Sequence, residues 1–152
     1  MKHVVVRQEQ SGFWLDPTAY LTVLPEIGEV LPPGARAFAL DSGHYDFASP
    51  QCVKDLKLAA VERFGDATAT VRFTANQWKH DCGLRLTYRD VVVLSLEPNI
   101  PLIPGTEDGL LGSHGSVLLD ELLPGDAGFT HEVLLSKGVL RVTAGDVLAA
   151  WV

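Results

Sequence analysis

Alternating apolar and polar positions are clearest in the middle of the chain. Every second residue is apolar in two segments, 67–74 (Ala69, Val71, Phe73) and 83–89 (Leu84, Leu86, Tyr88). Segment 55–63 begins with the same alternation, which Val61 breaks late. A period of two predicts antiparallel β-strands with one buried face and one solvent-facing face. Gly65-Asp66 lies where the first two of these strands would turn.

The remaining segments give a mixture of strand and helix signals. Strands are predicted over 2–7, 35–40 and 91–96, and a hairpin over 129–135 and 139–143 with a three-residue turn at 136–138. Asp16-Pro17 predicts a helix start. The Asp16 carboxylate can accept hydrogen bonds from the free N–H groups of the first turn, and the N–H that Pro17 lacks would have no partner there. That helix covers 17–23 and resumes over 26–30 after Pro25. Residues 117–123 favour a short helix, the segment ending at Trp151 favours a last half-turn, and 98–115 is a long loop.

These elements predict a mainly β (α+β) fold in a single domain over residues 1–152. The expected architecture is an antiparallel β-sandwich or a strongly bent sheet with one or two short helices. Apolar residues make up 47% of the chain and charged residues 20%, which excludes a disordered polymer. No apolar run approaches the ~18 residues of a membrane span, and no signal-peptide pattern is present. Two cysteines are too few for a disulfide scaffold, so we expect a compact cytoplasmic protein with no membrane partner.

The net charge of −7 is unevenly distributed along the chain. Residues 1–50 carry −3, residues 51–89 carry +3, and residues 90–152 carry −7. An acidic protein repels nucleic acid at long range, and we therefore expect no nucleic-acid partner. A local basic surface is still able to meet an acidic partner.

The basic middle segment supplies the first candidate binding site. Strand parity places five cations on the face opposite the core: Lys57, Arg63, Arg72, Arg85 and Arg89. Such a face suits an acidic protein, a phosphate or a polyanion, and the preference for arginine favours bidentate carboxylate recognition. The alternative is an ordinary solvated sheet face, where lysine and arginine also discourage aggregation.

A second candidate lies in the connection 76–82, which places Trp78, His80 and Asp81 close together in sequence. A carboxylate near His80 would hold its imidazole protonated, although neighbours in an extended segment point to opposite sides. Trp78 and His80 are thus candidate binding residues, and with Tyr45 and His131 they would line the pocket of an enzyme. The alternative for Trp78 is a cover over the core.

Motifs for other chemistry are absent from the sequence. The possible metal ligands do not have the spacing of a metal site: His44, His80, Cys82, His114 and His131. The segment around Ser113 is not a Gly-x-Ser-x-Gly motif, and no phosphate-binding glycine motif occurs. The sequence therefore predicts no catalytic residue, no metal and no cofactor. Within the apolar hairpin, Glu132 and Arg141 are expected to take part in a structural network with His131.

Several motifs in the last hundred residues resemble a class of small uncharacterised bacterial β-rich proteins, some of which resemble immunity proteins of toxin systems. They are Val-Lys-Asp-Leu at 53–56, Asn-Gln-Trp-Lys-His-Asp at 76–81, the strand 84–88, Leu-Leu-Asp-Glu-Leu-Leu at 118–123, Phe-Thr-His-Glu-Val-Leu-Leu at 129–135, Gly138 and Trp151. The resemblance implies a cytosolic bacterial protein with a partner-binding role and transfers no functional residue. The leading hypothesis is a non-enzymatic protein-binding module with an acidic protein partner. The alternatives are a small enzyme or ligand-binding domain, and a structural homodimer.

Overall fold

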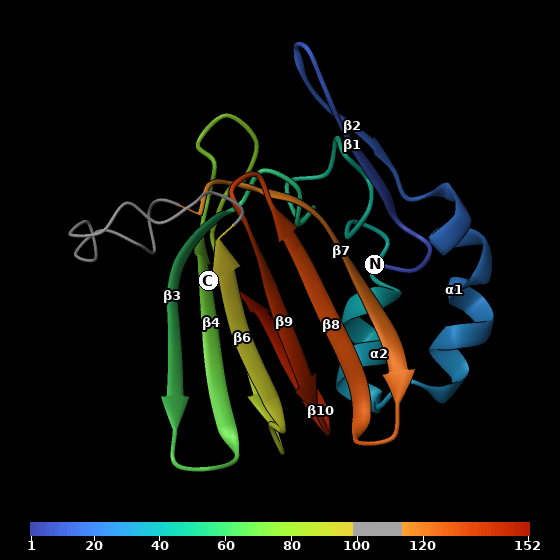
Figure 1. The fold of residues 1–152 in the computed structure, drawn as a ribbon, viewed down its shortest axis with the longest axis vertical. Helices are drawn as coiled ribbons and strands as arrows, with labels where there is room; N and C mark the ends of the chain where they lie inside the picture. Colours follow the sequence, from blue (N-terminus) through green and yellow to red (C-terminus); the bar gives the residue numbers. More distant parts are fainter. Residues whose placement is uncertain (99–113) are drawn as a thin grey trace.

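The computed structural model describes residues 1–98 and 114–152, which form three antiparallel sheets and two short helices (Figure 1). The expected mainly β fold class is therefore confirmed. Two four-stranded sheets carry the core. The first, here named the meander sheet, has the order β10-β5-β4-β3, with bounds Asp146–Trp151, Leu84–Arg89, Thr68–Thr74 and Lys57–Phe64. The second, here named the hairpin sheet, has the order β6-β9-β8-β7, with bounds Val93–Pro98, Gly138–Ala144, Gly128–Leu135 and Val117–Gly125.

The two sheets face each other across the core and are connected by a sharp bend. Tyr88 of β5 stacks on Phe129 of β8 with ring centroids 6.3 Å apart, and both side chains are fully buried. β5 leads into β6 through Asp90, which has a positive φ of 54°, and β9 leads into β10 through Gly145. A Cβ on Gly145 would lie 2.9 Å from the Cβ of Asp90, so the backbones approach closely at the bend. The sandwich and the strongly bent sheet are thus both features of this fold.

The alternation predicted for the middle of the chain is confirmed in β4 and β5. Their inward residues are buried and their outward residues are partly or fully exposed. The predicted turn at Gly65-Asp66 joins β3 to β4, and Gly65 there has a φ of 59°. The helix predicted after Asp16 is α1 (Thr18–Val30), which continues through Pro25 instead of stopping there. As expected, the Asp16 carboxylate accepts from the Thr18 N–H at 2.9 Å.

Three sequence predictions of element type are wrong. Residues 35–40 are not a strand, because Pro33–Ala39 forms helix α2 with Ala35, Phe38 and Ala39 buried on one side. Residues 117–123 are not a helix: they belong to β7, whose two faces are both covered, so its leucines do not alternate with polar residues. The end of the chain is strand β10 rather than a half-turn.

The predicted strand at 2–7 is instead β1 (Val5–Glu9), which pairs with β2 (Gly12–Asp16) in a two-stranded ribbon that projects beyond the sheets (Figure 1). The hairpin turn is also shorter than expected, because Leu135 pairs directly with Gly138 and leaves a two-residue loop.

Most of the predicted 98–115 loop lies outside the described residues. None of the helices in the described ranges is long and apolar enough to cross a membrane.

Candidate binding face and buried polar network

The outward side of the meander sheet carries four of the five cations predicted for the first candidate site. Lys57, Arg72, Arg85 and Arg89 are each exposed. Cross-strand register fixes their neighbours: Lys57 is opposite Thr74, Arg72 is opposite Arg85, and Arg89 is opposite Thr68. Because directly opposed residues share a face of the sheet, the four cations form one surface, here named the basic face.

Most of the charge on the basic face is not paired with acids. Arg72 lies 3.4 Å from the Glu62 carboxylate, and both side chains are about half exposed, at 54% and 45%. Within residues 1–98 and 114–152, Lys57, Arg85 and Arg89 form no ion pair. Asp146 is opposite Arg89, but its carboxylate accepts from the N–H groups of helix α2. The basic face therefore has unpaired cations available to a partner.

Arg63 does not belong to the basic face, contrary to the parity prediction. A β-bulge between Leu58 and Ala60 inserts one extra residue into β3 and reverses the parity beyond it. Arg63 consequently pairs with the inward residue Ala69, and its guanidinium donates to the carbonyl of Asp66 at 2.9 Å. The sequence shows this irregularity only as the late break at Val61.

The second candidate site is not a polar cluster. Trp78 is 97% exposed, whereas His80 is buried. His80 Nδ1 accepts from the Asn76 N–H at 3.1 Å, Nε2 donates to the Cys52 carbonyl at 2.8 Å, and the ring stacks on Trp151. Both nitrogens are used in backbone hydrogen bonds, so His80 fixes the loop in place and does not pair with Asp81. Of the four residues of the predicted pocket, only Tyr45 and His131 share a partner, Asp120.

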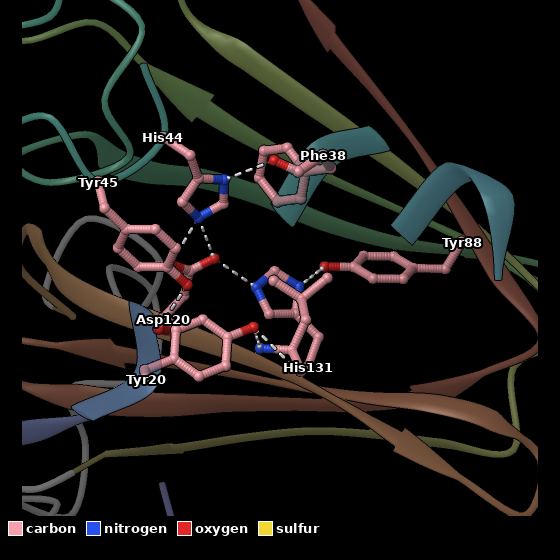
Figure 2. Close-up of polar contacts among 8 residues, drawn as sticks. Tyr20, Phe38, His44, Tyr45, Tyr88, Asp120 and His131 are labelled. Carbon is pink, nitrogen blue, oxygen red and sulfur yellow. Dashed lines mark hydrogen bonds and ion pairs between the residues drawn. The ribbon is translucent and has the colours of Figure 1, made fainter. Parts of the chain in front are cut away.

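A buried polar network centred on Asp120 lies between the sheets (Figure 2). Asp120 of β7 is 1% exposed, as are His44 and His131. His44 Nε2 lies 2.8 and 3.0 Å from the two Asp120 carboxylate oxygens, and His131 Nε2 of β8 lies 2.8 Å from one of them. His131 Nδ1 is 2.8 Å from the Tyr88 hydroxyl. The loop at His44, strand β5 and the β7–β8 hairpin are thus joined by one chain of hydrogen bonds.

Both histidines stabilise the charge of the Asp120 carboxylate. Burial alone would raise the pKa of the Asp120 carboxyl, but the charge of His44, hydrogen bonds from both histidines and the charge of His131 hold that pKa well below its usual range. His44 Nδ1 faces the Phe38 carbonyl at 3.0 Å, so both of its ring nitrogens face groups that only accept. Burial, together with the Asp120 charge, raises the pKa of Tyr88 well above its usual value, which keeps the hydroxyl protonated.

Two tyrosines support the network, Tyr20 from α1 and Tyr45 from the loop after α2. The Tyr45 hydroxyl donates to the Asp120 carbonyl at 3.1 Å, and burial raises the pKa of Tyr45 well above its usual value. The Tyr20 hydroxyl donates to the Leu122 carbonyl at 2.7 Å and accepts from the Leu122 N–H at 3.2 Å. These bonds hold β7 at the position where Asp120 meets both histidines.

Asp120 and its neighbour Glu121 point to opposite faces of β7 and do not act as a pair of acids. Glu121 accepts the backbone N–H groups of Lys2, His3 and Val4 at 2.5, 2.6 and 2.9 Å. On the same outer face, Glu132 accepts from Arg141 at 3.1 Å, as predicted across the hairpin. The expected link to His131 is wrong, because neighbouring residues of β8 point to opposite faces and His131 binds Asp120 and Tyr88 on the inner one. The acidic residues of this sheet thus hold the fold together.

The only member of this network for which the sequence predicted a polar structural role is His131, as a polar residue inside an apolar hairpin; its links to Asp120 and Tyr88, and through Asp120 to His44, were missed. The central residue of the network, Asp120, is 76 positions from His44 and 11 from His131. Among residues 1–98 and 114–152, no group of three or more His, Cys, Asp or Glu side chains is arranged to hold a metal ion. Both cysteines are free, and burial raises the pKa of the Cys52 thiol.

Comparison of the chain with protein-family models, with curated protein sequences and with solved structures gives no match.

Proposed function

We propose that this protein is a non-enzymatic binding module that recognises an acidic protein through the basic face of the meander sheet. One observation carries the proposal: four exposed cations share one sheet face of a protein whose net charge is −7. The remainder of the molecule is correspondingly more acidic. An acidic partner would be attracted to this face and repelled elsewhere, which orients the encounter.

The arginine pair at the centre of the face supports this proposal. Arg72 and Arg85 are direct cross-strand partners. Like charges directly opposite each other destabilise a sheet, and the only ion pair that either arginine forms among the described residues is the exposed one between Arg72 and Glu62, at 3.4 Å. A carboxylate placed between the two guanidinium groups would remove the repulsion and accept hydrogen bonds from both. Thr70 and Thr87, the next cross-strand pair on the same face, add hydroxyl groups that can bind the partner.

The buried network favours this reading over the enzyme alternative. A catalytic base must reach its substrate within hydrogen-bond distance, directly or through one water. His44, Asp120 and His131 are each 1% exposed and their side chains bond to one another, which supports a role in holding the sheets together. A role of the immunity type in the bacterial cytoplasm fits a binding module of this kind, and the partner would then be a toxin with an acidic surface.

Affinity capture from cells of the source organism tests the proposal. Wild-type protein is compared with the double charge reversal Arg72→Glu/Arg85→Glu and with Lys137→Glu, which reverses an exposed cation in the β8–β9 turn. We expect the wild type and Lys137→Glu to capture the same acidic protein, and the double variant to lose it. Equal capture by all three proteins, or capture only of basic proteins or nucleic acid, would contradict the proposal.

A further inference from the structure

A groove runs between strand β10 and helix α2 at one edge of the meander sheet. It has a volume of about 160 Å³. Its walls are mainly apolar and include Ala37, Phe38, Ala149 and Trp151, while the polar residues of the lining are Asp41, His44 and Gln51. Ala37 is exposed on α2, so the helix side of the groove is open to solvent.

The hydrogen-bond register shows which backbone groups of β10 face this groove. Gly83 and Val152 exchange two hydrogen bonds, of 2.8 and 2.9 Å, just beyond the ends of β5 and β10. In an antiparallel ladder such pairs alternate with pairs that exchange none. Ala150 and Leu148 therefore bond to β5, whereas the N–H and C=O groups of Ala149 and Trp151 point to the free edge.

The free edge is covered only at its beginning. The Val147 N–H donates to the Asp146 carboxylate at 2.8 Å, and Gly34 of α2 lies so close that a Cβ there would overlap the Val147 carbonyl oxygen. Beyond that point, no hydrogen bond within the described parts of the chain uses the edge groups of Ala149 or Trp151. Two successive edge positions thus remain unpaired beside an apolar groove.

Unpaired edge groups next to an apolar groove are the features by which a sheet accepts an extended peptide as an added strand. One side of the added strand would face Phe38 and Trp151, which favours apolar side chains there. Its other side would lie on the outer surface, next to Ala150. Because Ala150 is small and is paired with Arg85, the Arg85 guanidinium has a path across β10 to an acidic side chain of the peptide.

We infer that β10 binds an extended peptide segment with alternating apolar and acidic residues, which adds a fifth strand to the meander sheet. This inference rests on the proposed function, since it assigns part of the acidic partner to the groove beside the basic face. The peptide backbone would bond to Ala149 and Trp151, and its acidic side chains would bind Arg85.

A synthetic peptide of alternating valine and glutamate serves as the probe, and a valine–lysine peptide is the charge control. We expect the full-length protein to bind the glutamate probe and not the lysine probe. On binding, the Ala149 and Trp151 amides should become protected from hydrogen exchange, whereas the Leu148 and Ala150 amides, already in the ladder, should change little. Binding without protection at Ala149 and Trp151, or no binding at all, would overturn the inference.

Methylated probes test the strand addition without altering the protein. One probe carries N-methyl groups on its valine amides, and a second carries them on its glutamate amides. Alternate amides of a strand point to opposite edges, so one methylated probe should lose binding and the other should retain it. Equal binding of both methylated probes would show that the peptide backbone does not pair with β10.

Two variants locate the binding site. Ala149→Pro removes an edge N–H that the ladder does not use, and it should weaken binding about fivefold, the effect of one net amide hydrogen bond. Ala37→Leu fills the groove and should weaken binding comparably, while Ala19→Leu, at an exposed position of α1, should leave it unchanged. If Ala149→Pro and Ala37→Leu bind normally while Arg72→Glu/Arg85→Glu does not, the groove assignment is wrong and the proposed function stands.

Discussion

Replacement of Asp120 by asparagine tests the buried network most sharply, because the two side chains have the same shape and differ in charge. In the native protein the carboxylate accepts from two histidines, with nitrogen–oxygen distances of 2.8 to 3.0 Å, and is 1% exposed. Removing one partner of a buried ion pair costs about 3–5 kcal/mol. Asparagine retains one acceptor, so we expect about 3 kcal/mol for Asp120→Asn, which lowers the Tm by about 10 °C in a chain of this length.

The assay is urea unfolding followed by circular dichroism. Asp126→Asn, at an exposed turn position, is the matched control and should change the free energy of unfolding by less than about 0.5 kcal/mol. A loss below about 1 kcal/mol for Asp120→Asn would show that the Asp120 charge is not what stabilises the network.

A further three predictions concern pH and the contact between α2 and β10. The pKa of Asp120 is lower in the folded protein than its ordinary value of 3.8. The ionised carboxylate therefore stabilises the fold above that pH, and this stabilisation is lost as the pH falls below that value. The difference in free energy of unfolding between the wild type and Asp120→Asn should accordingly narrow below about pH 4. Gly34→Ala should destabilise by about 1–3 kcal/mol in urea unfolding, because its Cβ would overlap the Val147 carbonyl, whereas Gly125→Ala, whose Cβ would lie 3.6 Å from its nearest neighbour, should be nearly neutral. Asp146→Ala should cost about 1 kcal/mol in the same assay, because it removes the acceptor for the first N–H groups of α2, and an unchanged midpoint would contradict that role.

The sequence was sufficient to predict the strands with one buried face. β4 and β5 alternate because one side meets the core and the other meets water, and the cations of the basic face follow from that parity. The bulge after Leu58 appears in the alternation only as the late break at Val61, because one inserted residue changes parity without leaving a distinct composition. Arg63 was misplaced for that reason.

The element types of α2 and β7 were harder to predict, because α2 is short and β7 is apolar on both faces along most of its length. β7 is buried on both faces, so its leucines lack the alternation of a half-exposed strand. In α2, the buried residues Ala35, Phe38 and Ala39 have helical spacing, but a segment of seven residues is too short for that spacing to outweigh its strand-like apolar content. The Asp120 network depends on long-range packing, which no local pattern encodes.

The affinity of the purified partner for the basic face is the most direct test of the proposed function. The dissociation constant is measured by calorimetry for the wild type, for Arg72→Glu/Arg85→Glu and for Lys137→Glu, with the captured acidic protein as ligand. We expect the dissociation constant to rise at least about tenfold for Arg72→Glu/Arg85→Glu, and to change by less than about twofold for Lys137→Glu. Equal weakening by both variants would show that net charge, and not the basic face, determines binding, and would contradict the proposed function.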